Sequence, residues 1–482
     1  MTVEVLNRIG DELRPASDGA VVERRNPADH RQVVSVAPES TAEDVRDAVS
    51  AAVAAQPAWA ATPPSARAAV LERAADILAG RAEEIARELT AEEGKPLADA
   101  RAEASRTPTN LRLYAGEAVR LTGATFPSDD GGALVYTRLD PLGVVGAITP
   151  WNFPLNLAAR KIGPALAAGN AVVFKPSPHT PLMGERLAAA LAEAGLPPGV
   201  LNVVHGFAAG AALVADERVD GVTFTGSTAT GAAIHAALGP HRRAQLELGG
   251  NNPVVVLADA DLDRAAAVVA ASSFNLSGQA CTGAGRILVA EEVHDELVER
   301  VAARARALVL GPGDREGVTT GPLVTEDAVK AMAAVVEEAV ADGAEVVVGG
   351  RRGEGPDLEH GWFWEPTLLV GARPGMRLVD EEVFGPVVGV ERVADLDEAL
   401  ARANDTPYGL TAACCTTSLA AAQRFAAEIR AGMCRINRPT VGTAANAPFG
   451  GIKRSGSGAF KEQLGPGTMD FHVTARTVFL GS

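Results

Sequence analysis

The chain has 482 residues, of which 47% are hydrophobic and 22% charged, and 44 basic against 60 acidic side chains give a formal net charge of −16. This length exceeds one ordinary core, so the composition predicts two or three globular domains and excludes a disordered chain. The acidic balance is spread along the sequence, which argues against a nucleic-acid-binding or membrane-binding surface.

The N-terminal residues lack the apolar segment of a signal peptide, and we expect a cytoplasmic protein. The four cysteines show no CxxC spacing, which gives no support to a disulfide framework or a zinc site, and we expect reduced thiols. The eight histidines form no HExxH motif, so no metal is expected.

Helical periodicity dominates the first part of the chain. Thr41 has the pattern of a helix cap, and we expect this first helix to end at Pro57. Further helices are predicted over residues 66–78 and 81–93 and after Pro96. Their apolar stripes are typical of core-facing helices and show no sign of chemistry.

Two segments alternate like strands but are detached from the rest. Residues 123–140 read as a long hairpin, and residues 471–479 as a strand near the C-terminus. Because such segments cannot bury a face alone, we expect them to pair at the edges of neighbouring subunits.

A βαβ rhythm begins at Gly143 and predicts a doubly wound parallel sheet, an α/β fold whose ligands bind beyond the carboxyl ends of the strands. The expected strands and helices cover residues 144–148, 155–168, 171–174, 183–194, 200–204 and 221–224. A second α/β series covers residues 254–441, with strands near 254–257, 287–289, 344–348 and 387–390. Residues 247–252 then read as the crossing between two domains.

Cys281 is set among small residues 34 positions after Glu247, which ends a predicted strand before Gly249 and Gly250. A thiolate is a strong nucleophile when a base or a helix end lowers the pKa of its thiol. A lone cysteine is also commonly a small buried hydrophobic residue, so spacing alone leaves both readings open.

Three loops at strand ends carry unusual residues. In Thr149-Pro150-Trp151-Asn152-Phe153-Pro154, the Asn152 amide can donate to an oxyanion or cap the next helix. Lys175 suits ribose or phosphate oxygens, or is simply solvated. Residues 224–231 form a turn that opens a helix, a setting that favours a phosphate, although neither GxGxxG nor a P-loop is present.

Taken together, these residues resemble the aldehyde dehydrogenase superfamily over nearly the whole chain. Seven stretches occur in the family's order, and together they are very specific: Pro150 to Pro154, Lys175 to Ser177, Phe224 to Ser227, Glu247 to Gly250, Gly278 to Thr282, Glu382 to Pro386 and Pro448 to Gly451. The resemblance implies a dinucleotide-binding domain (1–122 and 141–247), a catalytic domain (248–450) and a β oligomerisation element (123–140 and 466–482). Homodimers or homotetramers are usual in this family.

The resemblance also implies a reaction. The Cys281 thiolate adds to an aldehyde carbonyl, the Asn152 amide and the Cys281 N–H hold the oxyanion, hydride passes to NAD or NADP, and Glu247 activates the water that hydrolyses the thioester. Lys161 is expected to support the oxyanion side. The implied cofactor-binding residues are Thr149, Pro150, Trp151, Lys175, Ser177, Gly206, Phe224, Gly226, Ser227, Glu382 and Phe384.

Two departures bear on specificity. Members that are strongly committed to NAD often have Glu three residues after the lysine, and Pro178 occupies that place here, so we predict use of NADP or of both cofactors. Arg160 lies eight residues after Asn152 and can face the oxyanion side or make a surface ion pair. Semialdehyde dehydrogenases place an Arg here for the distal carboxylate of the substrate. They commonly add a second Arg where this chain has Asn275.

The leading hypothesis is therefore oxidation of a short aldehyde that carries a carboxylate. The alternatives are a broad aliphatic or aromatic aldehyde dehydrogenase, a CoA-acylating member, which the presence of Glu247 disfavours, and a non-catalytic homologue, which Cys281, Glu247 and Asn152 together disfavour.

Overall fold

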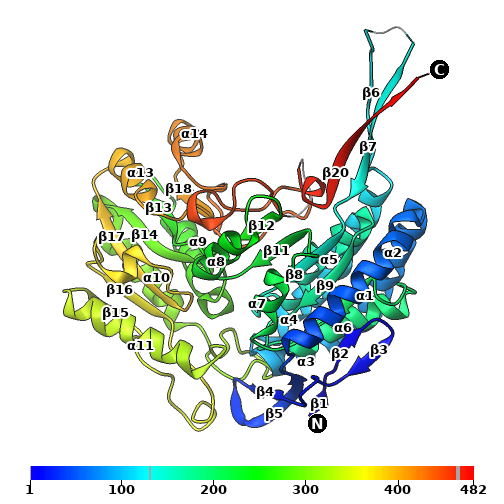
Figure 1. Cartoon of the computed structure of the whole chain (residues 1–482). Helices are drawn as coiled ribbons and strands as arrows, with labels where there is room; N and C mark the ends of the chain where they lie inside the picture. Colours follow the sequence, from blue (N-terminus) through cyan, green and yellow to red (C-terminus); the bar gives the residue numbers. More distant parts are fainter. Residues whose placement is uncertain (1, 130–131, 463–466, 482) are drawn as a thin grey trace.

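The structure is a computed structural model that describes residues 2–129, 132–462 and 467–481. Within these residues it contains two seven-stranded sheets and two three-stranded sheets. Figure 1 shows the two large sheets side by side, each flanked by helices, with a narrow arm projecting from the body. No helix in the described ranges has the length and apolar character needed to cross a membrane. Residues 130–131, 463–466 and 482, which fall in the predicted oligomerisation element or at its border, lie outside the described residues.

The first large sheet has the order β12-β11-β8-β9-β10-β2-β3, with parallel pairing from β12 to β10 and an antiparallel edge at β2 and β3. Its strands are β2 (Asn7–Ile9), β3 (Glu12–Arg14), β8 (Val144–Ile148), β9 (Ala171–Lys175), β10 (Leu201–Val203), β11 (Gly221–Thr225) and β12 (Arg243–Glu247). Every residue of β8, β9 and β11 is buried, as expected for strands covered on both faces.

Alternate residues of these strands enter two separate apolar cores. Val145 and Val172 pack with one set of helices, while Val144 and Val173 pack with another, so the sheet is doubly wound as predicted. One face carries α2 (Pro64–Gly80), α3 (Ala82–Glu93), α4 (Leu97–Ala118), α5 (Pro154–Ala168) and α6 (Pro181–Glu193); the other carries α1 (Ala42–Ala61), α7 (Ala209–Ala215) and α8 (Thr228–Leu238).

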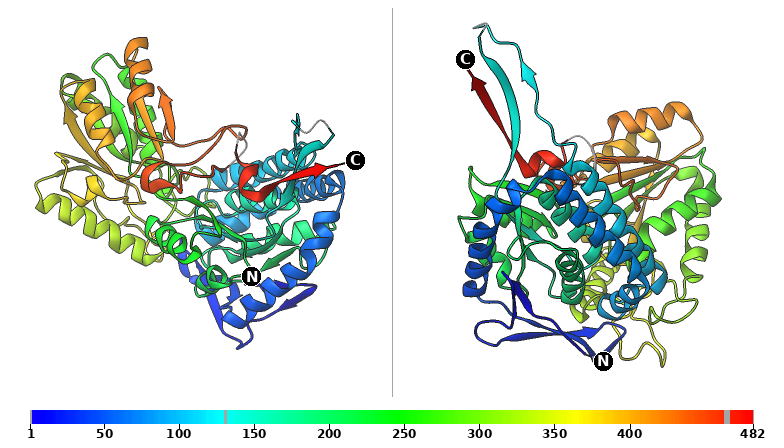
Figure 2. Two further views of the ribbon diagram at one scale, coloured as in Figure 1. Left: turned by 45° about the horizontal axis from the view of Figure 1, so that its top comes forward. Right: turned by 90° about the vertical axis from the view of Figure 1, so that its right-hand side faces the viewer.

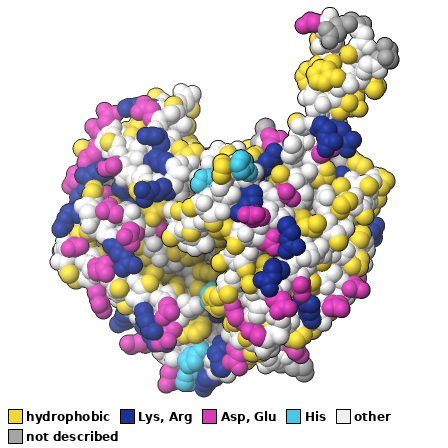
Figure 3. Space-filling view, viewed as in Figure 1, with side chains coloured by type: hydrophobic (Ala, Val, Ile, Leu, Met, Phe, Trp, Pro, Cys, Tyr) yellow, Lys and Arg dark blue, Asp and Glu magenta, His cyan; other side chains and the backbone are white. Residues whose placement is uncertain are grey.

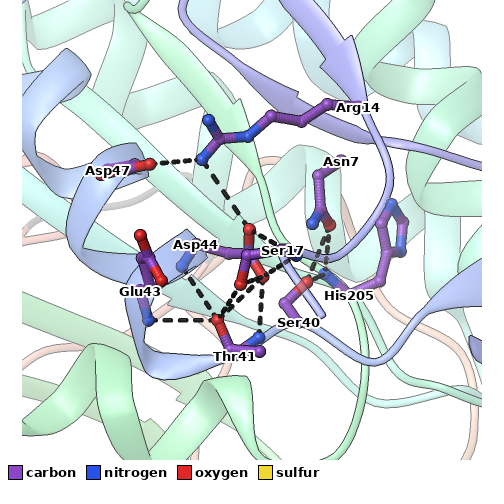
Figure 4. Close-up of polar contacts among 9 residues, drawn as sticks. All are labelled: Asn7, Arg14, Ser17, Ser40, Thr41, Glu43, Asp44, Asp47 and His205. Atoms are coloured by element: carbon purple, nitrogen blue, oxygen red, sulfur yellow. Dashed lines mark hydrogen bonds and ion pairs between the residues drawn. The ribbon is translucent and has the colours of Figure 1, made fainter. Parts of the chain in front are cut away.

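The start of α1 confirms the predicted cap. The Thr41 hydroxyl accepts from the N–H groups of Glu43 and Asp44, and the Asp44 carboxylate accepts from Thr41 N at 2.9 Å (Figure 4). Beside this cap, the Ser40 hydroxyl donates to the Asn7 side-chain oxygen at 2.8 Å, as the N–H of His205 also does at 3.2 Å. These contacts fix the loop that follows β10.

The predicted end of α1 at Pro57 is wrong, because the helix continues to Ala61. A proline inside a helix removes the hydrogen bond to the carbonyl four residues earlier. That residue is Val53, which is exposed, so water can satisfy its carbonyl group. Trp59 is buried and its ring N–H donates to Leu166 O at 3.1 Å, which anchors the last turn.

The second large sheet has the order β15-β16-β17-β14-β13-β18-β19 and is parallel except for β15. Its strands are β13 (Asn252–Val256), β14 (Ala284–Ala290), β15 (Glu345–Val348), β16 (Thr367–Val370), β17 (Val387–Val393), β18 (Thr411–Cys415) and β19 (Met433–Ile436). Its helices are α9 (Leu262–Phe274), α10 (His294–Arg306), α11 (Glu326–Ala341), α12 (Arg377–Asp380), α13 (Leu396–Asn404) and α14 (Leu419–Glu428). Val254 and Val255 enter cores on opposite faces, so this sheet is covered on both sides too.

The arm is a three-stranded sheet of β6 (Thr125–Phe126), β7 (Leu134–Pro141) and β20 (Val473–Leu480). β20 pairs with β7 along its whole length, from Val473 opposite Pro141 to Leu480 opposite Leu134, and Figure 2 shows the two strands together in both views. The segments predicted to be detached therefore pair with each other inside one chain. A fourth, small sheet is formed by β1 (Val3–Glu4), β4 (Val21–Asn26) and β5 (Asp29–Pro38).

Candidate active site

A cavity of about 320 Å³ lies where α4 and α5 of the first sheet face the loop before β14 and the loop around residue 443. It is lined on one side by Cys281 and Thr282 and on the other by side chains of both helices. Among the predicted site residues, Cys281 and Arg160 line it directly. Such a cavity, with polar groups gathered in a partly apolar wall, is the usual form of a small-molecule site.

Cys281 lies in a turn between a short 3-10 helix (Asn275–Gly278) and β14. Three consecutive residues before it, Leu276, Ser277 and Gly278, have positive φ angles of 53°, 54° and 68°. For the two non-glycine residues this conformation costs about 1–3 kcal/mol each, and such strain gathers at functional sites. The Ser277 hydroxyl helps to hold it by donating to Gly321 O at 2.8 Å.

The pKa of the Cys281 thiol is raised to about 12, first by burial and then by the carboxylates of Glu382, Glu247 and Glu462. The Arg160 guanidinium opposes this rise. The side chain of Cys281 is partly exposed. A helix that began at Cys281 would lower the pKa of the thiol, but the element that follows is a strand. The resting thiol is therefore neutral near pH 7, and a base is required to form the thiolate.

Asn152 lies in the loop between β8 and α5 and is 3% exposed. Its side-chain N–H₂ donates to Gln279 O at 3.0 Å, which brings the amide against the loop that carries Cys281. The alternative reading of Asn152 as a helix cap is wrong, because α5 begins after Phe153 without a side-chain cap. Instead, Glu103 accepts from the N–H groups of Leu155 and Asn156 at 3.0 and 3.1 Å.

Lys95 and Glu103 form a buried pair that holds this loop, and neither residue was predicted from the sequence. Lys95 Nζ donates to a Glu103 carboxylate oxygen at 2.7 Å and to Asn152 O at 2.6 Å. Glu93 lies 4.0 Å from the same ammonium group. The signal was available in the acidic run Glu92-Glu93 before Gly94 and Lys95, at the end of a helix that was assigned no chemistry.

Glu247 ends β12 and is 2% exposed. Its pKa is raised well above the usual value, first by burial and then by Glu462, while Lys161 and Lys461 oppose the rise. One carboxylate oxygen has no hydrogen-bond partner among the described residues. Gly450 lies so close that a Cβ there would approach the other oxygen to 2.4 Å. Among the described residues that line the Cys281 cavity, Glu247 is absent.

Lys161 lies on α5 in a buried polar network. Its Nζ donates to Glu462 at 2.9 Å and to the Thr223 hydroxyl at 3.1 Å, and Thr223 donates to Gln245 at 2.7 Å. Lys161 and Glu462 are both fully buried. The structure thus places Lys161 beside Glu462, a site residue that was not predicted from the sequence. The described residues that line the Cys281 cavity do not include Lys161.

The predicted cofactor residues cluster at the carboxyl ends of β8, β9 and β11. Lys175 Nζ donates to Gly206 O at 3.4 Å, and burial lowers the pKa of Lys175 to about 8, although nearby Glu39 opposes this. The Glu39 carboxylate accepts from the N–H groups of Phe207 at 2.8 Å and Ala208 at 2.9 Å. The Ser177 hydroxyl accepts from His179 N at 3.2 Å.

The turn after β11 opens α8 with Ser227 as its cap. The exposed Ser227 hydroxyl accepts from Thr230 N at 3.2 Å. Gly226 lies so close to the ring of Phe224 that a Cβ at this position would approach the ring to 2.4 Å. Close by in the fold, the hydroxyls of Thr149 and Thr225 are buried at strand ends without a hydrogen-bond partner in the described ranges. Unpartnered hydroxyls at this sheet edge fit a polar ligand such as a dinucleotide.

Two more predicted cofactor residues come from the second sheet. The ring of Phe384 packs edge-to-face against the ring of Trp151, which follows Pro150 in the chain, with 5.6 Å between the ring centres. The backbone of Phe384 has a φ of 53°. Glu382 accepts from Gly250 N at 3.0 Å, and burial raises its pKa to about 7. These contacts bring the loop before β17 to the loop after β8 and to the link between β12 and β13.

Arg160 projects from α5 into the Cys281 cavity and is 4% exposed, so the alternative reading of a surface ion pair is wrong. Its Nη2 donates to the Thr443 hydroxyl at 3.3 Å, and its guanidinium carbon lies 5.8 Å from the centre of the Phe449 ring. Asn275, which replaces the second arginine of the resemblance, lines the same cavity.

Comparisons with known proteins agree with this geometry. A sequence model described as the aldehyde dehydrogenase family matches residues 14–478. An alpha-ketoglutarate semialdehyde dehydrogenase of Haloferax volcanii is 41% identical over 99% of both chains. The mitochondrial succinate-semialdehyde dehydrogenase of Arabidopsis thaliana is 38% identical over 98% of this chain and 88% of that protein. The solved structure of 3,6-anhydro-L-galactose dehydrogenase in complex with NAP has a TM-score of 0.96 and 35% identity over 99% of this chain and 100% of that chain.

Proposed function

The chain belongs to the aldehyde dehydrogenase family and is an NAD(P)-dependent aldehyde dehydrogenase, and on that premise we propose that its substrate is a short semialdehyde carrying a carboxylate. The observation that carries this proposal is Arg160, a buried guanidinium inside the cavity that also holds Cys281. A carboxylate matches a guanidinium in shape and charge, so a substrate carboxylate in this cavity can pair with Arg160.

We propose Cys281 as the nucleophile. Its thiolate adds to the aldehyde carbon, and the resulting oxyanion accepts from the Asn152 amide and the Cys281 N–H, which gives a thiohemiacetal. The Asn152 amide already lies at Gln279, two residues before the nucleophile, which supports this role. A bound NAD or NADP supplies the acceptor for the hydride that the thiohemiacetal loses.

We propose Glu247 as the general base that activates the water molecule that attacks the thioester on Cys281. Its raised pKa makes the carboxylate a stronger base than an exposed glutamate, because burial and the nearby Glu462 disfavour its charged form. Lys161, held by Glu462, would supply positive charge on the oxyanion side of the site rather than contact the aldehyde.

The cofactor is proposed to lie along the carboxyl ends of the first sheet. Lys175, Ser177 and Gly206 would hold the adenosine ribose, and Phe224, Gly226 and Ser227 the pyrophosphate. Thr149, Pro150, Trp151, Glu382 and Phe384 would contact the nicotinamide half. On this basis the dinucleotide-binding part is residues 1–122 and 141–247, and the catalytic part is residues 248–450.

We also propose that the enzyme is a cytoplasmic homodimer or homotetramer assembled through the arm. Large apolar side chains on the arm are exposed, and the arm stands clear of the body (Figure 3). They are Phe126, Leu134, Phe479 and Leu480. Exposed apolar side chains on sheet edges suit pairing with another copy. The four cysteines are all free, as suits a reducing compartment.

The test is a panel of aldehydes assayed with both cofactors in the wild-type enzyme and in Arg160→Ala. We expect kcat/KM for succinic semialdehyde and 2,5-dioxopentanoate to exceed that for pentanal in the wild type. The substitution should lower it about tenfold to a hundredfold for the two acids, the loss expected for one charge-assisted hydrogen-bonded pair. Equal activity of Arg160→Ala and wild type on both acids would overturn the proposed substrate class.

A further inference from the structure

The Cys281 cavity contains a second guanidinium, that of Arg106, which was not predicted from the sequence. Arg106 lies on α4, while Arg160 lies on α5, and both line the cavity. Arg106 Nη2 donates to the Thr443 hydroxyl at 2.8 Å and also to the Thr443 carbonyl oxygen. Because Arg160 Nη2 donates to the same hydroxyl at 3.3 Å, two cations from different helices converge on one oxygen atom.

Arg106 forms no ion pair with a carboxylate in the ranges 2–129, 132–462 and 467–481. Glu103 lines the cavity but is engaged by Lys95 and by the first N–H groups of α5. Asp99 also lines the cavity, but no ion pair joins it to Arg106 among the described residues. The pKa of Arg106 is lowered, first by burial and then by the charge of Arg160.

A single carboxylate does not use this arrangement fully. One guanidinium binds one carboxylate through two parallel N–H···O bonds, which leaves the donors of the second guanidinium without an anionic partner. A 2-oxo carboxylate carries a third oxygen next to the carboxylate, and three acceptor oxygens in one plane can be shared between two forks. Asn156 adds a side-chain amide to the same wall of the cavity. The oxygen of this amide already accepts a hydrogen bond from the Asn110 side chain.

We infer that Arg106, Arg160 and Thr443 form a subsite for a 2-oxo carboxylate in the Cys281 cavity, and that Arg106 selects substrates with the 2-oxo group. This inference rests on the proposed function and narrows it, from a short semialdehyde with a carboxylate to one whose carboxylate carries a neighbouring carbonyl. Arg106 is a specificity residue in this account and takes no part in the chemistry at Cys281.

Three aldehydes of the same chain length test the inference. 2,5-Dioxopentanoate has the carboxylate and the 2-oxo group, 5-oxopentanoate has only the carboxylate, and pentanal has neither. In Arg106→Gln we expect the kcat/KM ratio of 2,5-dioxopentanoate to 5-oxopentanoate to fall about tenfold, mainly through KM, as a lost charge-assisted hydrogen bond predicts. Arg106→Lys, which keeps the charge but not the fork, should restore part of that ratio.

A matched control lies on the same helix. Arg112 pairs with Asp76 on the protein surface, away from the cavity, and Arg112→Gln should leave the ratio at the wild-type value. An equal loss on all three aldehydes in both Arg106 variants would show that Arg106 only supports the Thr443 loop. An unchanged ratio in Arg106→Gln would show that it does not contact the 2-oxo group. Either result overturns the inference.

A binding experiment separates this inference from the proposed function. Calorimetric titration of 2-oxoglutarate and of glutarate into the enzyme needs no turnover. We expect Arg106→Gln to weaken 2-oxoglutarate about tenfold more than glutarate. If the wild type does not prefer the two acids to pentanal, the proposed function fails, and the titration still decides the subsite: a selective loss of 2-oxoglutarate binding supports it, and equal binding overturns it.

Discussion

The ammonium group of Lys95 lies 2.6 Å from the main-chain oxygen of Asn152 and 2.7 Å from Glu103, inside a fully enclosed part of the protein. Glu103 in turn accepts from the first N–H groups of α5. The amide proposed to stabilise the oxyanion is therefore positioned from behind by a salt bridge that does not itself face the aldehyde.

Replacing Lys95 should disturb both stability and turnover. Lys95→Met leaves Glu93 and Glu103 buried without their cation, which costs about 3–5 kcal/mol of unfolding free energy. A displacement of Asn152 by a fraction of an ångström to one ångström should lower kcat up to about 10²-fold. Urea unfolding and steady-state kinetics measure these effects. Lys330→Met, on the exposed face of α11, is the control, and a Lys95 variant that behaved like it would contradict the prediction.

Removing the sulfur of Cys281 should abolish aldehyde oxidation while the protein stays folded. Cys281→Ser keeps the size of the side chain but offers a hydroxyl that is a far weaker nucleophile. Cys434→Ser changes an exposed cysteine outside the cavity and should keep wild-type activity. Reduction of NAD(P) followed by absorbance measures both. Turnover by Cys281→Ser at a rate near that of Cys434→Ser would reject the nucleophile.

Loss of the Asn152 amide should lower kcat about 10²–10³-fold, as for one donor of an oxyanion hole. Asn152→Ala should still permit alkylation of Cys281 by iodoacetamide, because the thiol itself is unchanged. Kinetics and mass spectrometry of the alkylated protein separate the two properties. A variant with normal kcat would show that another donor holds the oxyanion.

The titration of Lys175 should change cofactor affinity and the free energy of unfolding in opposite directions as the pH rises. Its pKa is about 8 in the folded protein, below the usual value of 10.5, so it is charged below pH 8 and neutral above. Affinity for NAD or NADP should fall as the pH rises through 8. Between pH 8 and 10.5 the unfolded chain binds the proton more tightly, so this group makes the unfolding free energy rise with pH. Lys175→Met should remove both trends, which titrations of cofactor and of urea at several pH values would detect.

The carboxylate of Glu39 also bears on cofactor preference. Pro178 removes the usual acid, but Glu39 lies beside Gly206 and Lys175, where the adenosine ribose is proposed. We expect NADP to be used at a rate within about a hundredfold of NAD, roughly 2.7 kcal/mol. Glu39→Gln should raise the NADP-to-NAD ratio of kcat/KM, because it removes a charge that repels the 2′-phosphate. An unchanged NADP-to-NAD ratio of kcat/KM would show that Glu39 does not affect the cofactor preference.

Several parts of this architecture could be predicted from the sequence because they depend on local patterns. The apolar runs that became β8, β9 and β11 are buried on both faces, and the loops after them carry the predicted residues. The wrong end of α1 has a simple cause: the sequence shows the proline but not Trp59, whose buried ring holds the following turn.

Lys95, Glu103 and Arg106 could not be predicted in the same way. Helical periodicity reports which face of a helix is apolar, and a charged residue at the edge of that face reads as solvated. Glu103 and Arg106 are three residues apart on α4, so they share one face, but only packing of α4 against α5 turns that face into the wall of a cavity. Glu462 was missed for a related reason, because its partner Lys161 lies 301 residues earlier.

The enclosure of Glu247 by the C-terminal segment also affects how the protein is made. Gly450 lies against its carboxylate, and Gly456 forms a β-bridge with the backbone of Glu247. Both glycines lie more than 200 residues after Glu247 in the sequence. During translation this carboxylate therefore stays open to water until the segment with Gly450 and Gly456 has been made and has folded back onto β12.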